Sequence, residues 1–262
     1  MPSHRDARKG AERTDPLERQ ARAALAESAR TLALLEQKNA AAVAAAAEMV
    51  LGCFENGGTV FFCGNGGSAA DAQHLAAEFS GRYLIDRPGL PAVALTANSS
   101  AVTAIGNDYG YDQVFARQLE GLGSPGDVLV AITTSGRSES VRRAVRAAQT
   151  LDMTVIGMTG AKGGEFAALC DVALVTPSAS TPNIQEGHIA MGHAFCLLVE
   201  RALFPHGAPV AGPRQTPRKP RGVRKRVAAP AAAKGTDPSP GALPRARGVP
   251  VRRTGPGSRS RA

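Results

Sequence analysis

Two stretches of the chain place histidine near a carboxylate at spacings that could support chemistry. In "AADAQHLAAEF", His74 and Glu78 lie four residues apart, with Asp71 one turn earlier. In "NIQEGHIAMGHAF", Glu186 and His193 lie seven residues apart. Residues at these spacings share one face of a helix, so each pair can act together. A histidine–carboxylate pair suits general acid–base catalysis, because the pKa values of both groups can be tuned towards neutrality.

The same side chains could instead hold a metal ion. Zinc binds histidine nitrogen and carboxylate oxygen, usually with four ligands. Gln185 adds an amide to the second stretch, roughly 80° around the helix from His193. The alternative interpretation is a pair of solvated helix surfaces. A His–x3–Glu spacing alone does not separate these three possibilities.

Two further segments have the composition of phosphate-binding loops. "GNGGS" at residues 64–68 and "TTSGRS" at residues 133–138 each follow an apolar run and precede a helical stretch. Backbone N–H groups at a helix N-terminus lack intrahelical partners and carry partial positive charge, so they stabilise an anion such as phosphate. Ordinary N-caps and turns use the same residues. The hydroxyls that could contribute belong to Ser68, Thr133, Thr134, Ser135 and Ser138.

These loops match neither of the common nucleotide-binding patterns. The glycines of the first loop do not form G-x-G-x-x-G, and neither loop contains the lysine of an NTPase phosphate loop. The sequence therefore argues against a dinucleotide-binding enzyme and against an NTPase.

The elements that would position these groups alternate along the chain. Apolar runs predict strands, and helix-forming segments lie between them. Continuous apolar runs indicate strands covered on both faces, which favours an α/β fold with an open, mostly parallel five-stranded sheet flanked by helices. Ligands bind such sheets beyond the carboxyl ends of the strands. The predicted strands are 59–63, 91–95, 127–132, 154–158 and 172–175, and the predicted helices are 68–83, 100–107, 111–122, 138–151, 164–169 and 182–203.

An N-terminal helical extension precedes this alternation. Residues 16–55 are rich in Ala, Leu, Glu and Arg, with no glycine or proline between Pro16 and Gly52. Forty residues is long for one globular helix, so we expect two helices with a break near Lys38–Asn39. Leucine and alanine occupy more than one face of this segment, so we expect it to pack against other subunits.

The charge divides the chain into a body and a tail. Residues 211–262 hold 14 Lys/Arg and one acidic residue, whereas the first 210 residues hold 17 Lys/Arg and 21 Asp/Glu. The tail is rich in proline and has no aromatic residue, so we expect it to be disordered. The predicted domains are a flexible N-terminus at 1–15, a folded domain at 16–210 and the basic tail at 211–262. Non-specific contact with nucleic acid is one reading of the tail, and an inert extension is the other.

Cysteine usage and hydropathy point to a cytoplasmic protein. The four cysteines lie far apart in apolar contexts, which is typical of free thiols in a reducing compartment. No apolar run reaches the roughly 18 residues of a membrane span, and the polar N-terminus does not resemble a secretory signal.

Taken together, the motifs resemble a known family. "CGNGGSAADAQHLAAEFSGRY", "AIGNDYGYDQVFARQ", "GDVLVAITTSGRS" and "NIQEGHIAMGHAF" are similar, in order and spacing, to the sugar isomerase (SIS) domain of phosphoheptose isomerases, over about residues 17–206. The resemblance implies a flavodoxin-like SIS fold and the interconversion of D-sedoheptulose 7-phosphate and D-glycero-D-manno-heptose 7-phosphate. It also implies a cytoplasmic homotetramer with shared active sites and one Zn²⁺ per subunit.

The resemblance further assigns roles to residues at matching positions. Glu78 and His193 would be the catalytic acid and base. The zinc ligands would be His74, Glu78, Gln185 and His193. Substrate contacts would come from Asn65, Gly66, Gly67, Ser68, Glu78, Arg82, Asn107, Asp108, Thr133, Thr134, Ser135, Ser138 and Gln185.

Two other functions stay open at this point. A relative of the family is a non-catalytic protein that associates with the bacterial replication initiator, and a sugar-phosphate sensor would bind through the same loops without turnover. The relative lacks the glutamate and the final histidine, so the presence of both Glu78 and His193 favours an enzyme.

Overall fold

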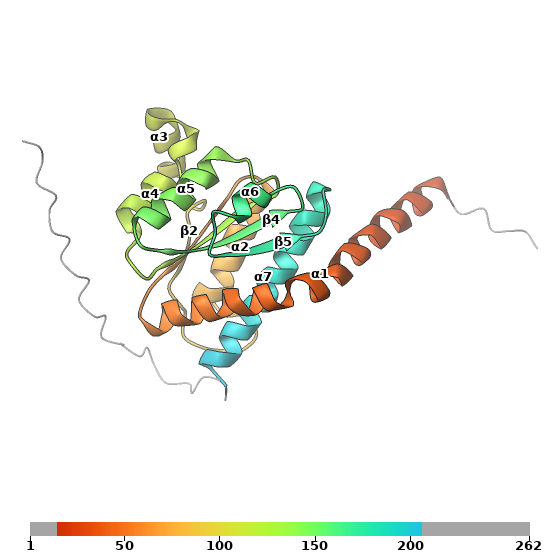
Figure 1. Ribbon diagram of the computed structural model, residues 1–262, viewed down its shortest axis with the longest axis horizontal. Coiled ribbons are helices and arrows are strands. Elements are labelled where there is room, and N and C mark those ends of the chain that lie inside the picture. The colour runs from red at the N-terminus through yellow and green to blue at the C-terminus, as the bar shows by residue number, and fades with distance from the viewer. Residues whose placement is uncertain (1–14, 206–262) are drawn as a thin grey trace, which may run out of the picture. The chain divides into compact units, whose positions relative to one another are not determined.

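The structure, a computed structural model, describes residues 15–205. At its centre is a five-stranded sheet in the order β2-β1-β3-β4-β5, with every neighbouring pair parallel (Figure 1). This confirms the predicted five-stranded α/β architecture. The strands are β1 (Val60–Gly64), β2 (Ala92–Ala94), β3 (Val128–Thr133), β4 (Thr154–Gly160) and β5 (Val172–Thr176).

The strands are continuous apolar runs because both faces of the sheet are covered. On β1, Val60 and Phe62 join the core on one face, and Phe61 and Cys63 join the core on the other. Every residue of β1 and β3 is buried. This double burial explains why the strands could be predicted from hydrophobicity without an alternating pattern.

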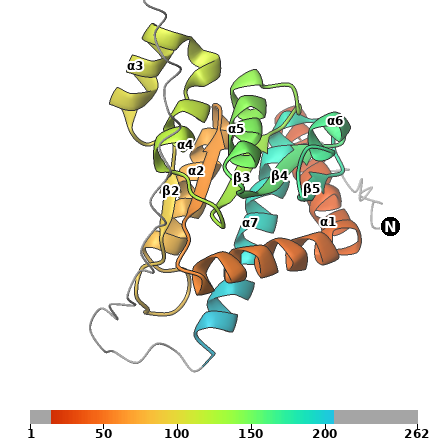
Figure 2. The same ribbon diagram turned by 60° about the vertical axis from the view of Figure 1, so that its left-hand side comes forward.

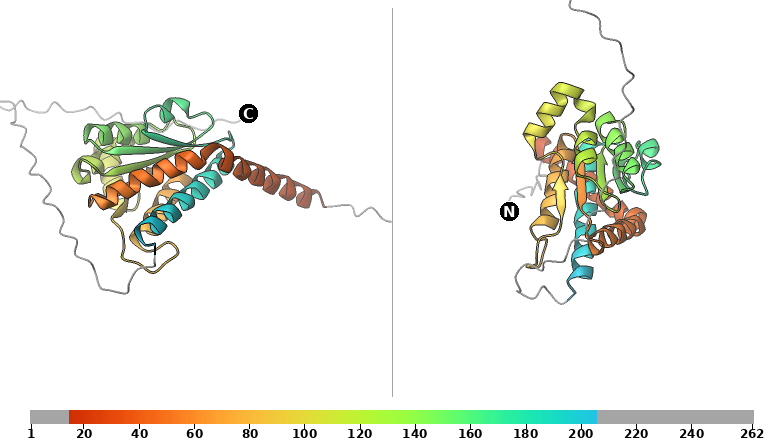
Figure 3. Two further views of the ribbon diagram at one scale, coloured as in Figure 1. Left: turned by 60° about the horizontal axis from the view of Figure 1, so that its bottom comes forward. Right: turned by 90° about the vertical axis from the view of Figure 1, so that its left-hand side faces the viewer.

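Each face of the sheet has its own helices, as Figure 3 shows. α1 (Pro16–Glu55), α2 (Gly67–Ser80) and α7 (Thr181–Leu203) cover one face. The other face carries α4 (Ala116–Leu122), α5 (Glu139–Thr150) and α6 (Gly164–Ala167). α3 (Ser99–Tyr109) has no buried residue and stands away from the sheet beyond α4 (Figure 2), and a short 3-10 turn, η1 (Tyr111–Gln113), follows it.

The predicted break near Lys38–Asn39 is wrong, because α1 is a single helix of 40 residues. Asn39 lies on the buried side of the helix, where its amide donates to the carbonyl of Val175 at 3.1 Å and accepts from the Val175 N–H at 3.0 Å. The residue that suggested a break therefore ties the helix to β5. Residues 16–27 of α1 are exposed and extend beyond the sheet (Figure 1).

The strand order reverses at β1, and ligands bind sheets of this type at such a point. β1 lies between β2 and β3, so the chain leaves β1 towards one edge and later returns to its other side. Gly64 at the end of β1 is in register with Ile132 near the end of β3. The loops after these two strands are therefore neighbours at the carboxyl edge, at the point where the strand order reverses.

The remaining predictions concern the other helices and the two ends of the chain. The other predicted helices are present with shifted ends, except that the predicted helix 111–122 is η1 followed by α4. The basic tail and all but one residue of the predicted flexible N-terminus lie outside the described residues. Among residues 15–205, no helix is long and apolar enough to cross a membrane.

Candidate active site

Three of the candidate side chains meet between α2 and α7. The Nε2 atoms of His74 and His193 are 2.9 Å apart, and His74 Nε2 is 3.0 Å from Glu78 Oε1. One ligand atom from each of the three lies within 4.8 Å of the others. We call these three residues the His–Glu–His cluster. Two imidazoles and one carboxylate form a donor set that suits zinc, and three protein ligands with one open position are typical of catalytic zinc sites.

Two glycines allow the helices to approach closely enough for this meeting. A Cβ at Gly192 of α7 would lie 2.6 Å from a methyl carbon of Leu75 on α2. A Cβ at Gly67 of α2 would lie 2.0 Å from Nε2 of Gln185 on α7. Neither position accepts a larger side chain without movement. The close approach of α2 and α7 beside the cluster therefore depends on Gly192.

The electrostatic surroundings keep the cluster suited to accepting protons or a cation. Burial and the neighbouring His74 hold the pKa of His193 below its usual value, against the opposing effect of Glu78. Burial raises the pKa of Asp71, one turn before His74, to about 6, and the attraction of His74 offsets only part of that shift. A neutral imidazole at His193 can act as a base or as a metal ligand.

The two predicted phosphate loops are connected directly. Asn65, which follows β1, donates its amide to the hydroxyls of Ser138 at 2.7 Å and Ser140 at 2.9 Å. Its amide oxygen accepts from the Tyr111 hydroxyl at 2.8 Å. Gly66 has a positive φ of 57°, a conformation that favours glycine, and α2 begins one residue later. The first turns of α2 and α5 thus start side by side at the carboxyl edge.

The structure places the remaining predicted residues in two groups. The hydroxyl residues of the second loop lie beside Asn65 and are buried or half-buried. In contrast, Arg82, Asn107 and Asp108 are exposed, with the Asn107 amide donating to the Asp108 carboxylate. The residues of the two loops are Asn65, Gly66, Gly67, Ser68, Thr133, Thr134, Ser135 and Ser138.

Gln185 is the predicted fourth zinc ligand. Its amide lies against Gly67, and Gly67 is seven residues before His74, or about 10 Å along α2. On α7, eight residues separate Gln185 from His193, a rise of about 12 Å. Gln185 therefore lies beside the phosphate loops, and its role as a zinc ligand stays a prediction.

Several side chains in the site were not identified from their residue types. Tyr111 supports Asn65, and the Tyr83 ring lies 5.7 Å from the His193 ring. Ser140 adds a hydroxyl to the second loop. All lie inside or next to the motifs quoted above, so proximity to a motif is the only sequence signal that could have indicated them.

The chain is similar to known proteins over most of its described residues. Residues 25–160 match the family model of the SIS domain. A phosphoheptose isomerase from Rhodospirillum rubrum is 57% identical over 164 residues, covering 63% of this chain and 87% of that protein. One from Burkholderia pseudomallei is 50% identical over 182 residues, covering 69% of this chain and 92% of that protein.

Solved structures agree with these relatives. The phosphoheptose isomerase of Neisseria gonorrhoeae superposes with a TM-score of 0.67 at 48% identity, covering 70% of this chain and 98% of that one. The phosphoheptose isomerase of Francisella tularensis gives a TM-score of 0.68 at 38% identity, covering 70% and 97%. With its fold, loops and His–Glu–His cluster in place, this chain belongs to the phosphoheptose isomerase family of SIS-domain proteins.

Proposed function

We propose that this protein is an isomerase that interconverts D-sedoheptulose 7-phosphate and D-glycero-D-manno-heptose 7-phosphate. The observation that carries the proposal is the meeting of His74, Glu78 and His193 on two helices whose N-termini lie at the phosphate-loop edge. The substrate has a phosphate at one end and the reacting C1–C2 unit at the other. The site offers suitable groups for both.

The phosphate end is served by the paired loops. Backbone N–H groups at the start of α2 and hydroxyls of Thr134, Ser135 and Ser138 can bind the anion without a lysine or arginine. Asn65 holds the second loop in place through Ser138 and Ser140. This arrangement recognises a phosphate monoester and leaves the sugar free to extend along α2.

The reacting end is served by Glu78 and His193. Ketose–aldose exchange removes a proton from one carbon, forms an enediol, and returns a proton to the neighbouring carbon, while a proton moves between the two oxygens. One group must accept and another must donate. Positioned acid–base groups typically contribute about 10²–10⁴-fold to the rate. Burial and the neighbouring His74 lower the pKa of His193, which favours the neutral ring that can accept a proton.

The same three residues would hold a zinc ion, one per subunit. The close approach of His74 Nε2 and His193 Nε2, with Glu78 beside them, fits a divalent cation. Bound there, zinc would supply charge stabilisation to the enediolate oxygen. Gln185, whose amide lies beside Gly67 in this chain, is the proposed fourth ligand. A water or a substrate oxygen is the alternative at that position.

The active protein is proposed to be a homotetramer with shared active sites. Residues 16–27 of α1 are exposed and include Leu17 at 72% and Leu25 at 71% exposure, which a second copy could cover. Arg82, Asn107 and Asp108 are exposed in one chain and therefore free to contact substrate bound to another subunit. Light scattering on a chain lacking residues 1–30 tests this, and a fully active monomer would contradict it.

The two non-catalytic alternatives are less well supported. A partner of the replication initiator or a sugar-phosphate sensor needs the loops but has no use for an assembled acid–base cluster. Here the cluster is assembled from residues 119 positions apart in the sequence. The assembly of the His–Glu–His cluster therefore favours turnover over binding alone.

The deciding experiment is an assay of the purified protein with D-sedoheptulose 7-phosphate, with and without added zinc and after chelation. We expect turnover that chelation lowers and zinc restores. Glu78→Gln and His193→Gln should each lower turnover by at least about 100-fold. The control is Glu165→Gln, which removes an exposed carboxylate whose side chain is 89% exposed. Sugar-phosphate binding without turnover in the wild type would favour the sensor instead.

A further inference from the structure

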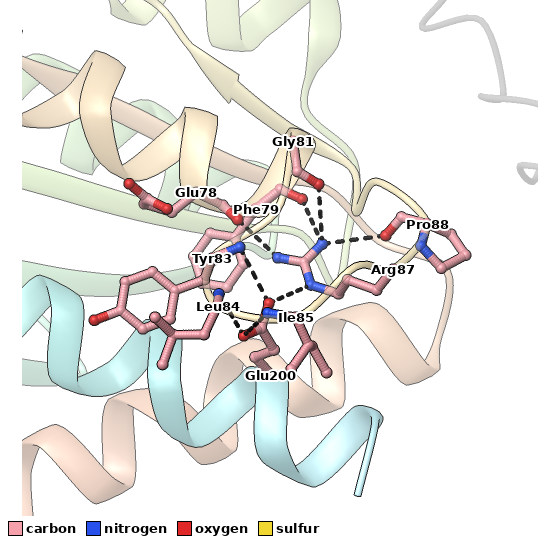
Figure 4. Close-up of polar contacts among 9 residues, drawn as sticks. All are labelled: Glu78, Phe79, Gly81, Tyr83, Leu84, Ile85, Arg87, Pro88 and Glu200. Atoms are coloured by element: carbon pink, nitrogen blue, oxygen red, sulfur yellow. Dashed lines mark hydrogen bonds and ion pairs between the residues drawn. The ribbon is translucent and has the colours of Figure 1, made fainter. Parts of the chain in front are cut away.

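A buried ion pair lies two helical turns beyond the cluster. Arg87, in the loop after α2, donates from Nε to Glu200 Oε1 on α7 at 2.8 Å. The two side chains are 1% and 3% exposed. Figure 4 shows the pair between the C-terminal end of α2, the loop of residues 81–88 and α7.

Both charged groups make several hydrogen bonds to the backbone. Glu200 accepts the backbone N–H groups of Tyr83, Leu84 and Ile85 at 3.1, 2.8 and 3.2 Å. Burial alone would raise the pKa of Glu200, but these bonds and Arg87 hold it below its usual value. The carboxylate therefore fixes three consecutive residues of the loop.

Arg87 performs the complementary role for backbone carbonyls. Its guanidinium donates to the carbonyls of Glu78 at 2.7 Å and Phe79 at 2.9 Å, in the last turn of α2. It also reaches the carbonyls of Gly81 at 3.4 Å and Pro88 at 3.1 Å. The last carbonyls of a helix lack intrahelical partners and carry partial negative charge, so a buried cation stabilises them. A lysine could not bind all of these carbonyls, because its ammonium group lacks the planar, forked geometry of the arginine guanidinium.

These contacts join every element that builds the His–Glu–His cluster. Arg87 binds the backbone of Glu78 itself, and Glu200 lies seven residues after His193 on the same helix. The loop that Glu200 holds carries Tyr83, whose ring packs against His193. The pair thus connects α2, which carries His74 and Glu78, with α7, which carries His193. It also connects both helices with the Tyr83 ring beside His193.

We propose that Arg87 and Glu200 are positioning residues that set the register of α2 against α7 and thereby the geometry of the His–Glu–His cluster. This inference rests on the proposed function, because it concerns the same site. A purely structural role is the alternative. The two roles can be separated with a second buried carboxylate that binds backbone N–H groups far from the cluster, because its loss should lower stability without changing the site.

The experiment compares the wild type with the double variant Arg87→Met/Glu200→Leu, with Arg87→Lys and with Asp127→Asn. Asp127 is a matched control: it is 2% exposed and accepts the N–H groups of Thr59 and Ser124, but it lies at the amino end of β3. Three quantities are measured for each protein: the melting temperature, the Zn²⁺ affinity of the metal-free protein, and kcat and KM for D-sedoheptulose 7-phosphate.

We expect the double variant to have a lower melting temperature, because the backbone groups that Arg87 and Glu200 bind lose their partners. Its Zn²⁺ affinity and kcat should each fall about 10–100-fold, the range seen when residues that orient metal ligands are replaced. KM should change little, because the phosphate loops are untouched. Arg87→Lys should show the same losses. Asp127→Asn should lower the melting temperature but leave Zn²⁺ affinity unchanged.

Wild-type Zn²⁺ affinity and kcat in the double variant or in Arg87→Lys would overturn the inference. If the double variant does not fold, Arg87→Lys alone decides, because it keeps the charge pair. If the wild type shows no turnover, the proposed function fails, and the positioning role is then judged by Zn²⁺ affinity and by hydrogen exchange at the Tyr83–Ile85 amides. Unchanged exchange and unchanged affinity in Arg87→Lys would overturn it in that case too.

Discussion

His188 and His193 lie five residues apart on α7 but have different surroundings. His193 belongs to the cluster, whereas His188 is 0% exposed. Within residues 15–205, neither ring nitrogen of His188 makes a hydrogen bond of good geometry, although the Thr159 backbone lies close enough to interact with the ring. Burial lowers its pKa from 6.5 to about 4, with the Thr159 backbone opposing the shift. His188 is therefore neutral in the folded protein at any pH above about 4.

This difference predicts a pH dependence of folding stability. Because the folded pKa lies below the unfolded value, the unfolded chain binds the proton first, and His188 costs stability as pH falls from 6.5 towards 4. The full effect is at most about 3 kcal/mol, since one pKa unit corresponds to about 1.36 kcal/mol. His188→Leu should flatten the pH dependence of the unfolding free energy in this window, measured by urea denaturation. Parallel curves for variant and wild type would contradict the prediction.

A second prediction at this scale concerns the phosphate. Ser135 lies in the loop after β3, where its hydroxyl accepts the N–H of Arg137 and can donate to an anion. Ser135→Ala should weaken the binding of inorganic phosphate by about 1–3 kcal/mol, the value of a hydrogen bond to a charged group. Calorimetric titration measures this. Ser80→Ala, at the opposite end of α2, is the control. Equal affinity in the two variants would mean that the loop is only a turn.

At the scale of elements, the contact between α2 and α7 leaves no room for a side chain at Gly192. Gly192→Ala would place a methyl group 2.6 Å from the Leu75 side chain and force the helices apart. Overpacking of this kind costs about 1–3 kcal/mol. We expect a lower melting temperature and weaker Zn²⁺ binding, measured on the same preparation.

Gly121→Ala in α4 is the matched control, because nothing lies within 4 Å of the added carbon. Alanine also favours a helix over glycine, so its melting temperature should be equal or higher. If Gly192→Ala matched this control in both measurements, the close approach of α2 and α7 would not matter for the site.

The elements differ in how far the sequence predicts them. The strands and phosphate loops are encoded locally, because an apolar run followed by glycine and hydroxyl residues signals its own conformation. The Arg87–Glu200 pair is not encoded locally, because its two residues lie 113 positions apart and neither belongs to a recognisable motif. A break in α1 was expected because 40 residues is long for one globular helix, and the contact of Asn39 with Val175 could not be known from the local sequence. In both cases the structure depends on contacts between residues that are far apart in the sequence.

The same limit applies to the candidate site. His74 and Glu78 pair within one helix, so their spacing identified them, whereas the arrival of His193 depends on Gly192 and the packing of α7. The family resemblance, and not spacing, supplied Gln185 as a zinc ligand, and the structure keeps its amide at Gly67. The role of Gln185 as a zinc ligand therefore stays a prediction.

At the scale of the whole molecule, the basic segment 211–262 lies outside the described residues, and its role stays a prediction. Its 14 Lys/Arg and single acidic residue can offer charge, and without aromatics it cannot stack on bases. A chain ending at Ala211 should keep full isomerase activity and lose salt-sensitive binding to DNA. Activity and DNA binding are measured at low and physiological salt. Lost activity would assign the segment to the active assembly, and retained binding would place a DNA site on the body.

The pairing of Asn39 with Val175 also limits how molecules can associate through the sheet. β5 is an outer strand, and the free N–H and C=O groups of such a strand can recruit a strand from another molecule. The Asn39 amide occupies both the N–H and the C=O of Val175. An incoming chain would have to displace it before the sheet could grow. One side chain of α1 thus protects this rim of the sheet against the edge-to-edge polymerisation that leads to aggregates.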